Sequence, residues 1–204
     1  MDVIIIDYGM GNIGSVFRAL EECGANVLVT EDPADIHKAN KFVLPGVGAF
    51  PDGMRALTER GWDEAIKVAI SNEGNSLLGI CLGMQLFATR SYEGVETLGL
   101  NLIPGTVEKL CPSCTEERIP HIGWNEVNLE GDSELMAGVE SGTDYYFVHS
   151  YHFIPNDENN ILSMTPYCGG FVSSISNRNI FGVQFHPEKS SKVGFKLIKN
   201  FMRV

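Results

Sequence analysis

Short runs of apolar residues alternate with amphipathic stretches along the first half of the sequence, and this order limits the folds that the chain can adopt. The runs lack polar alternation, as in strands that are buried on both faces of a sheet. We expect strands at Val3–Asp7, Asn26–Thr30, Lys41–Leu44 and Ser76–Ile80. Helical spacing predicts helices at Asn12–Cys23, Asp32–Ala39, Met54–Glu73 and Met84–Arg90. This order predicts an α/β fold with a mostly parallel central sheet flanked by helices.

The second half has a different pattern, in which strands follow one another closely. Strands are expected at Leu102–Leu110, Trp124–Leu129, Tyr145–Phe153, Ile161–Thr165, Phe171–Ser176 and Ile180–Phe185. Such close strands are typical of hairpins, so we expect an antiparallel extension of the sheet. A closing helix is expected at Val193–Met202. Because no repeat or linker divides the sequence, residues 1–204 are expected to form a single domain.

Composition excludes several classes of protein. The 15 Lys and Arg residues against 26 Asp and Glu residues give a net charge of −11, and nucleic acid would repel so acidic a chain. The apolar run at Val3–Ile6 is much shorter than a signal sequence or a membrane span requires. Five cysteines, an odd number, suit free thiols rather than a disulfide framework. We therefore expect a cytoplasmic protein that binds neither nucleic acid nor membranes.

One cysteine lies in Gly79-Ile80-Cys81-Leu82-Gly83, between a predicted strand and a predicted helix. This is the cysteine form of the nucleophile elbow, a sharp turn that needs small residues on both sides of the nucleophile. The N-terminus of the following helix favours the reactive thiolate. The backbone amide of Leu82 would point to where an oxyanion forms. The flanking glycines favour a nucleophile over a buried structural cysteine.

A base for this thiol is offered by the motif Phe185-His186-Pro187-Glu188. His186 could accept the thiol proton, and Glu188 could hold the other ring nitrogen, since residues two apart project to the same side of an extended chain. Pro187 prevents regular strand pairing. The turn Pro45-Gly46-Val47-Gly48 could supply a second oxyanion donor from its backbone. These features favour a Cys–His–Glu triad over a histidine in an ordinary loop.

Two other motifs leave other functions open. The segment Gly9-Met10-Gly11-Asn12-Ile13-Gly14 matches G-x-G-x-x-G, and Glu31 and Asp32 follow the next predicted strand, as in dinucleotide-binding proteins. The other interpretation is a tight glycine-rich turn without a ligand. The C-x-x-C motif Cys111-Pro112-Ser113-Cys114 allows a redox pair or half of a zinc site, although no second cysteine pair follows at metal-binding spacing. An exposed turn with two thiols is the simpler interpretation.

The sequence resembles the class I (triad) glutamine amidotransferases, and among them the glutaminase subunits of imidazole glycerol phosphate synthases. Five blocks carry the resemblance: Asp7-Tyr8-Gly9-Met10-Gly11-Asn12, Gly79-Ile80-Cys81-Leu82-Gly83-Met84-Gln85, Pro120-His121-Ile122-Gly123-Trp124-Asn125, Tyr146-Phe147-Val148-His149-Ser150-Tyr151 and Gly182-Val183-Gln184-Phe185-His186-Pro187-Glu188-Lys189-Ser190. Each block is moderately specific, and their joint order across nearly the whole chain is highly specific.

The resemblance implies that the protein hydrolyses glutamine. Cys81 would attack the side-chain amide, His186 would transfer the proton and Glu188 would orient His186, so that a glutamyl thioester forms while ammonia leaves. The oxyanion would be bound by the amide of Leu82 and by one from Val47 or Gly48, in a loop that can be misaligned until a partner binds. The residues implied to hold glutamine are Gly48, Gln85, His149, Ser150 and Tyr151. No cofactor and no metal are implied.

The resemblance also implies a partner, a separate cyclase subunit with a (βα)₈ barrel that would form a heterodimer with this chain. The ammonia would be joined there to a phosphorylated ribulosyl aminoimidazole carboxamide, giving imidazole glycerol phosphate and an aminoimidazole carboxamide ribonucleotide in histidine biosynthesis. Interface positions would be Asn12, Trp124, Tyr146 and Lys189, so the Gly9–Asn12 turn would face the partner and bind no dinucleotide. Related glutaminases serve a different synthase in the amidation of surface-polysaccharide sugars, and this pathway is the alternative.

Overall fold

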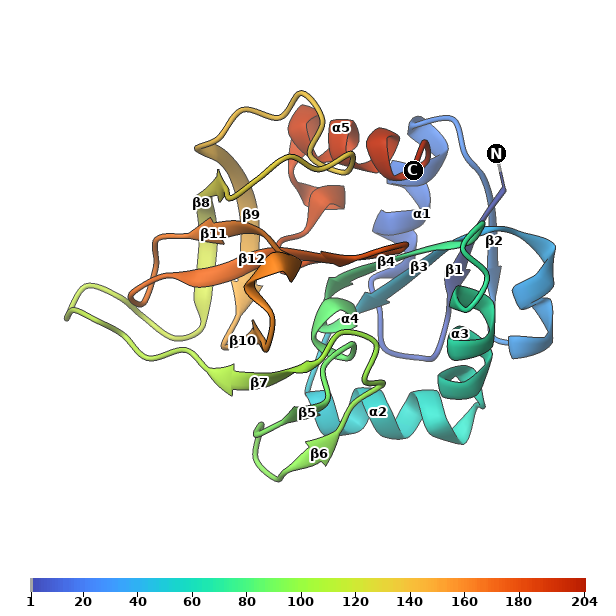
Figure 1. The fold of residues 1–204 in the computed structure, drawn as a ribbon, viewed down its shortest axis with the longest axis horizontal. Coiled ribbons are helices and arrows are strands. Elements are labelled where there is room, and N and C mark those ends of the chain that lie inside the picture. Colours follow the sequence, from blue (N-terminus) through green and yellow to red (C-terminus); the bar gives the residue numbers. More distant parts are fainter. Residues whose placement is uncertain (1) are drawn as a thin grey trace.

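Two sheets organise the protein in a computed structural model, which describes residues 2–204 (Figure 1). Within that range the large sheet has nine strands, in spatial order β2 (Asn26–Thr30), β1 (Asp2–Ile6), β3 (Lys41–Gly46), β4 (Ser76–Cys81), β13 (Ile180–Val183), β12 (Phe171–Asn177), β11 (Ile161–Thr165), β8 (His121–Leu129) and β9 (Thr143–His149). The small sheet there has four, β10 (Tyr151–Pro155), β7 (Gly105–Lys109), β5 (Arg90–Ser91) and β6 (Thr97–Leu98).

The large sheet divides into a parallel part and an antiparallel part. Strand β1 pairs in parallel with β2 and β3, and β4 pairs in parallel with β3 and β13. From β13 onward, through β12, β11, β8 and β9, each neighbouring pair is antiparallel. The predicted α/β class, with a parallel sheet that is extended by antiparallel strands in the second half of the chain, is confirmed.

Helices cover both faces of the parallel part (Figure 1). Helices α1 (Ile13–Glu22) and α5 (Ser191–Phe201) lie on one face, and α2 (Phe50–Glu59), α3 (Trp62–Ile70) and α4 (Leu82–Gln85) lie on the other. Successive residues of β1 therefore enter different cores: Val3 and Ile5 pack on the side of α1 and α5, and Ile4 packs on the side of α2 and α3. Because both faces are buried, the strand sequence is apolar without alternation.

Two predicted helices have different bounds in the structure. The stretch expected as one helix at Met54–Glu73 forms α2 and α3, because Gly61 adopts a left-handed φ of 74° between them. The helix expected at Met84–Arg90 ends after one turn, since the carbonyl groups of Leu86 and Phe87 accept hydrogen bonds from Leu100 and Leu102 instead of from the following turn. Among residues 2–204 no helix is both long and apolar enough to cross a membrane.

Short 3₁₀ segments and one corner complete the fold. The 3₁₀ segments are η1 (Pro33–Lys38), η2 (Glu158–Asn160) and η3 (Pro187–Lys189). The strand expected at Tyr145–Phe153 is divided, because the chain leaves the large sheet at His149 and enters the small sheet at Tyr151. Ser150 therefore lies at a corner between the two sheets, and this corner forms one wall of the candidate site described below.

Helix α3 gives a direct test of which side chains stabilise the fold. Ile66 is 1% exposed and Val68 is 69% exposed. We expect Ile66→Ala to lower the free energy of unfolding by about 2–5 kcal/mol, because it removes buried methyl groups and leaves a cavity. The matched change Val68→Ala should stay within about 0.5 kcal/mol of the wild type. Urea denaturation measures both, and equal losses would contradict the packing described here.

Candidate active site

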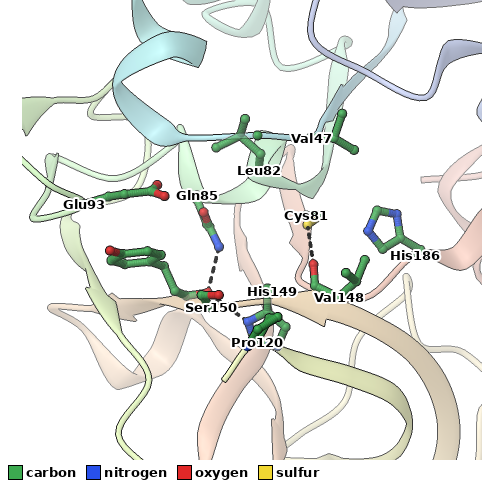
Figure 2. Close-up of a pocket in the computed structure, with 12 residues that line it drawn as sticks. Val47, Cys81, Leu82, Gln85, Glu93, Pro120, Val148, His149, Ser150 and His186 are labelled. Carbon is green, nitrogen blue, oxygen red and sulfur yellow. Dashed lines mark hydrogen bonds between the residues drawn. The ribbon is translucent and has the colours of Figure 1, made fainter. Parts of the chain in front are cut away.

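The candidate catalytic groups lie where neighbouring parallel strands end. The Gly9–Asn12 turn follows β1, the Pro45–Gly48 loop ends β3, Cys81 ends β4 and His186 follows β13. Ligands bind to open α/β sheets at this edge, outside the carboxyl ends of the strands. A cavity of about 340 Å³ opens there. Its lining residues are Val47, Gly48, Cys81, Leu82, Gln85, Glu93, Pro120, Val148, His149, Ser150, Tyr151 and His186 (Figure 2).

The backbone at Cys81 forms the tight turn that the motif predicts. Its φ of 55° and ψ of −110° lie in a region that side-chain-bearing residues rarely adopt. A Cβ atom at Gly79 would lie 2.6 Å from Cζ of Phe87, and one at Gly83 would overlap the carbonyl oxygen of Leu44. Both glycines are therefore required by close approach, and the turn holds the thiol at the cavity wall.

Two glutamine side chains connect Cys81 to the backbone of Tyr151. Nε2 of Gln184 lies 3.6 Å from Sγ of Cys81, and Oε1 of Gln184 accepts a hydrogen bond of 2.9 Å from Gln85. Gln85 also donates to the carbonyl oxygen of Tyr151 at 2.8 Å. Gln85 was expected to hold the substrate, and the structure places its amide group on the cavity wall. Gln184 was not expected in the site, although it lies in a block that the resemblance used.

His186 and Glu188 form a buried pair. Nδ1 of His186 lies 2.8 Å from Oε1 of Glu188, and the two side chains are 3% and 1% exposed. The residues meet through the 3₁₀ turn η3 and not through an extended segment, so the physical reason given for this contact in the sequence analysis is wrong. The backbone N–H of His186 donates to the carbonyl oxygen of Tyr146 at 2.9 Å, which fixes the start of the turn.

The second ring nitrogen of His186 faces the nucleophile. Figure 2 shows the imidazole turned toward Cys81, and Nε2 is buried without a hydrogen-bond partner among residues 2–204. Burial alone would lower the pKa of His186, but Cys81 and Glu188 outweigh it and raise this pKa to about 9. The imidazole therefore favours the protonated form between these two groups. The structure thus brings together the three residues that the sequence predicted as a triad.

The three predicted oxyanion residues lie beside the thiol. The amide of Leu82 is at the first position of α4, where an N–H group has no acceptor within its own helix. The N–H of Val47 donates to the carbonyl oxygen of Met10 at 3.2 Å. Gly48 adopts a φ of 112°, which glycine alone adopts easily. In this conformation the amide of Val47 is bonded within the protein, so it would have to turn before it could bind an oxyanion.

Glu93 lines the cavity and was missed by the sequence analysis. Its Oε2 accepts a hydrogen bond of 2.8 Å from the backbone N–H of Phe50, the first residue of α2. Burial raises the pKa of Glu93. No local motif marks this residue, because it lies between two short strands of the small sheet. In Figure 2 it lies on the opposite side of the cavity from His186.

Three of the predicted interface residues form one cluster at the surface. Trp124 on β8 pairs with Tyr146 on β9, and their ring centroids are 6.1 Å apart. Nζ of Lys189 lies 5.8 Å from the Tyr146 ring centroid, and Trp124 is 55% exposed. The fourth residue, Asn12, is at the start of α1, which contacts the η3 segment that carries Lys189. We call the cluster of Trp124, Tyr146 and Lys189 the aromatic face.

The glycine motif has structural reasons within the protein. A Cβ atom at Gly9 would lie 2.9 Å from Nη2 of Arg60, and one at Gly11 would lie 3.1 Å from Cγ of Pro45. Nη1 of Arg60 lies 3.3 Å from Oε2 of Glu31, the acid that a ribose would need. The turn is therefore occupied by protein groups, which argues against the dinucleotide interpretation.

The cysteines of the C-x-x-C motif are outside the lining of the cavity. Cys111 and Cys114 are exposed thiols outside any disulfide. In the part of the chain that the structure describes, no group of three or more His, Cys, Asp or Glu side chains is placed to hold a metal ion. Neither thiol lines the cavity that holds Cys81.

Comparison with known proteins defines the family. Residues 4–204 match the model of the class I glutamine amidotransferases. A solved structure described as a glutamine amidotransferase superposes with a TM-score of 0.77 at 16% identity, covering 98% of this chain and 97% of that one, which shows the same fold.

Relatives with known names show to which family within this class the chain belongs. Imidazole glycerol phosphate synthase subunit HisH of Moorella thermoacetica is 47% identical over 98% of this chain and 93% of its own length. The protein of the same name from Geobacter sulfurreducens is 45% identical over 98% of this chain and 97% of its own length. The chain therefore belongs to the class I glutamine amidotransferases and, among them, to the family of imidazole glycerol phosphate synthase subunits HisH.

The buried pair gives a pH-dependent prediction. Because Cys81 and Glu188 raise the pKa of His186 from 6.5 to about 9, their contacts with His186 stabilise the fold fully below pH 6.5, and this contribution is lost as the pH rises through about 9. We expect Glu188→Gln to lower the free energy of unfolding by about 1.5–3 kcal/mol below pH 6.5 and by less at high pH. Urea denaturation across this range measures the difference. The exposed control Glu59→Gln should show no such dependence, and a loss from Glu188→Gln that grows with pH would refute the assignment.

Proposed function

We propose that Cys81, His186 and Glu188 hydrolyse the side-chain amide of glutamine, and that the ammonia feeds a second subunit of imidazole glycerol phosphate synthase. One observation carries the proposal: in a chain of the glutamine amidotransferase family, a strained cysteine and a carboxylate-bound histidine line the same cavity. The names of the relatives favour histidine biosynthesis over the amidation of surface sugars.

The geometry supports a two-stage reaction. In the first stage His186 takes the thiol proton of Cys81, Sγ attacks the amide carbon, and the tetrahedral oxyanion forms near the amide of Leu82. His186 then donates its proton to the leaving nitrogen, so ammonia departs and a glutamyl thioester remains. In the second stage His186 takes a proton from water, which attacks the thioester and releases glutamate with the thiol restored. Throughout, Glu188 holds Nδ1 of the ring so that Nε2 stays directed at the reacting atoms.

The cavity walls suit an amino-acid substrate. Glu93 offers a carboxylate across the cavity from His186, where it would bind the α-ammonium group of glutamine. Gly48, Ser150 and Tyr151 also line the cavity, and Gln85 donates a hydrogen bond to the carbonyl oxygen of Tyr151. These contacts would orient the side-chain amide of glutamine toward Cys81. Such positioning speeds the reaction because the reacting atoms are already held close together.

The hydrogen bond from Val47 to Met10 supports a role for the partner. This bond connects the oxyanion loop to the Gly9–Asn12 turn, which the proposal places at the interface with the synthase subunit. If the partner displaces the turn, the Val47 peptide becomes free to rotate and to donate to the oxyanion. The isolated chain would then have weak activity and the complex strong activity, because the second donor forms only in the complex.

The aromatic face supports the position of the partner. Trp124 and Tyr146 are aromatic residues of the kind that anchor interfaces, and the backbone of Tyr146 also holds His186. We propose that a (βα)₈ cyclase subunit docks here as a heterodimer. The ammonia would then leave the cavity toward that subunit. The cysteines, all free thiols among residues 2–204, suit a reducing compartment, so we place the enzyme in the cytoplasm.

The role of Cys81 is tested by glutamate release from glutamine in the presence of the cyclase subunit and its ligand. We expect Cys81→Ala to reduce the rate by at least about 10⁴-fold, because the nucleophile forms the bond that all later steps need. The control Cys111→Ala changes an exposed thiol outside the cavity and should retain full activity. Activity that survives in Cys81→Ala would exclude the thioester mechanism.

The docking face is tested by affinity. We expect Trp124→Ala to weaken binding of the cyclase subunit by about thirtyfold, the size of a central aromatic anchor. Leu98→Ala, which truncates a side chain that is 68% exposed on the small sheet, serves as the control and should bind normally. Calorimetric titration measures both. If the two variants bind alike, the interface lies elsewhere.

A further inference from the structure

His149 lines the cavity, yet both of its ring nitrogens are bonded to protein groups. Nδ1 lies 2.8 Å from the carbonyl oxygen of Tyr151, two residues along the chain. Nε2 lies 3.1 Å from Nδ1 of His121 on the neighbouring strand β8. The ring therefore has no nitrogen left for a substrate, and its bonds instead shape the corner where the chain passes from β9 to β10.

The direction of these hydrogen bonds follows from one backbone amide. The N–H of Glu126 donates to Oδ1 of Asn125 at 2.9 Å, so the amide nitrogen of Asn125 faces Nε2 of His121, 3.3 Å away. That nitrogen can only donate, so Nε2 of His121 accepts and Nδ1 of His121 carries the proton. His121 then donates to Nε2 of His149, which leaves the proton of His149 on Nδ1, where Tyr151 requires it. The position of each proton therefore determines the position of the next one.

The surroundings of His121 and His149 keep both rings neutral, as the directions of these hydrogen bonds require. Burial lowers the pKa of His121 to about 4 and that of His149 to about 3. The ring of His121 stacks on Tyr167 with centroids 4.1 Å apart and lies 5.0 Å from Phe147. A charged imidazolium would have to donate from both nitrogens, which would set it against the amide of Asn125. The aromatic surroundings and the hydrogen bonds therefore select the same state.

We propose that His121 and Asn125 are positioning residues that set the tautomer of His149 and thereby hold the His149–Tyr151 corner in the shape that binds glutamine. This inference rests on the proposed glutaminase function. It adds residues that touch neither the substrate nor the reacting atoms. His121 is outside the cavity lining, and its side chain reaches the lining through its hydrogen bond to His149.

The corner connects this chain of hydrogen bonds to the nucleophile. The carbonyl oxygen of Tyr151 accepts from both His149 and Gln85, and Gln85 in turn donates to Gln184, which contacts Cys81. At its other end this series of hydrogen bonds reaches Asn125, which is next to Trp124 of the aromatic face in the sequence. Hydrogen bonds thus connect the docking surface to the cavity wall at the His149–Tyr151 corner. These hydrogen bonds affect the geometry of glutamine binding, while the proton transfers are carried out by His186.

Kinetics with a matched pair of variants test the inference. His121→Phe keeps an aromatic ring against Tyr167 but removes the donor to His149. We expect the KM for glutamine to rise about tenfold, the effect of one lost bond to a buried acceptor, with kcat within about twofold of the wild type. His121→Asn places an amide N–H where Nδ1–H lies, so it should restore KM to within about threefold. Both variants are assayed in complex with the cyclase subunit.

The kinetic outcome can overturn the proposal in two ways. An unchanged KM in His121→Phe means that the corner does not need the bond. A KM that rises equally in His121→Phe and His121→Asn means that only the packing of His121 matters. Complete inactivity of the wild type with an intact spectrum would instead reject the glutaminase proposal, and the spectroscopic test that follows remains decisive for the tautomers.

Nitrogen NMR of the histidine rings tests the tautomers without relying on activity. We expect His121 and His149 of the wild type to carry their protons on Nδ1. Asn125→Asp replaces the donor with a group that only accepts, so His121 should move its proton to Nε2 or become charged, and the signals of His149 should shift with it. Asn128→Asp adds the same charge on the same strand and should leave both rings unchanged. An Nε2–H tautomer at wild-type His149, or spectra unaltered by Asn125→Asp, would overturn the inference.

Discussion

The close approach of two backbone segments beside Cys81 is the constraint on which the site depends. Gly83 packs against the carbonyl group of Leu44, and a Cβ atom at Gly46 would lie 2.7 Å from the amide nitrogen of Gly83. The end of β3 and the start of α4 are therefore in direct contact. Cys81, two residues before Gly83, has a positive φ, and Val47 and Gly48 line the same cavity as its thiol. The proposed nucleophile and the proposed oxyanion loop therefore lie on either side of the same packing contact.

The order of strands adds the remaining groups to this centre. Strand β4 has β3 on one side and β13 on the other, so the loop after β13 brings His186 to the same edge from the opposite direction. The antiparallel part of the sheet begins at β12 and contributes the far wall through the corner at Ser150. The candidate catalytic groups come from the parallel part, while the corner and the two rings of the aromatic face come from the antiparallel part. The parallel and antiparallel parts of the sheet, which differ in sequence pattern, therefore contribute different features of the site.

The sequence could predict those features that depend on local chemistry. The α/β class followed from apolar strands that alternate with helices, and it is confirmed together with the family. The candidate triad could be proposed because a nucleophile elbow needs glycines at Gly79 and Gly83, and because His186 and Glu188 lie close along the chain. The parallel half was predicted better than the helix after Cys81, since the hydrogen bonds that end this helix come from residues distant in sequence.

Features made by distant segments could not be predicted in this way. Glu93 reaches the cavity only because the small sheet folds against α2, and no pattern around it signals this. The contact between His121 and His149 depends on the pairing of β8 with β9, and the split at Ser150 depends on where two sheets meet. The glycine motif after β1 gave a misleading dinucleotide signal because close packing and phosphate binding both require glycine.

Intact-protein mass spectrometry followed by peptide mapping tests most directly whether a covalent intermediate forms at Cys81. The complex with the cyclase subunit is mixed with glutamine and quenched in acid during turnover. We predict a mass increase of one glutamyl group on the peptide that contains Cys81, reversed by alkaline hydrolysis. Continued glutamate production with no adduct on that peptide, or an adduct on another cysteine, would contradict the mechanism derived from this site.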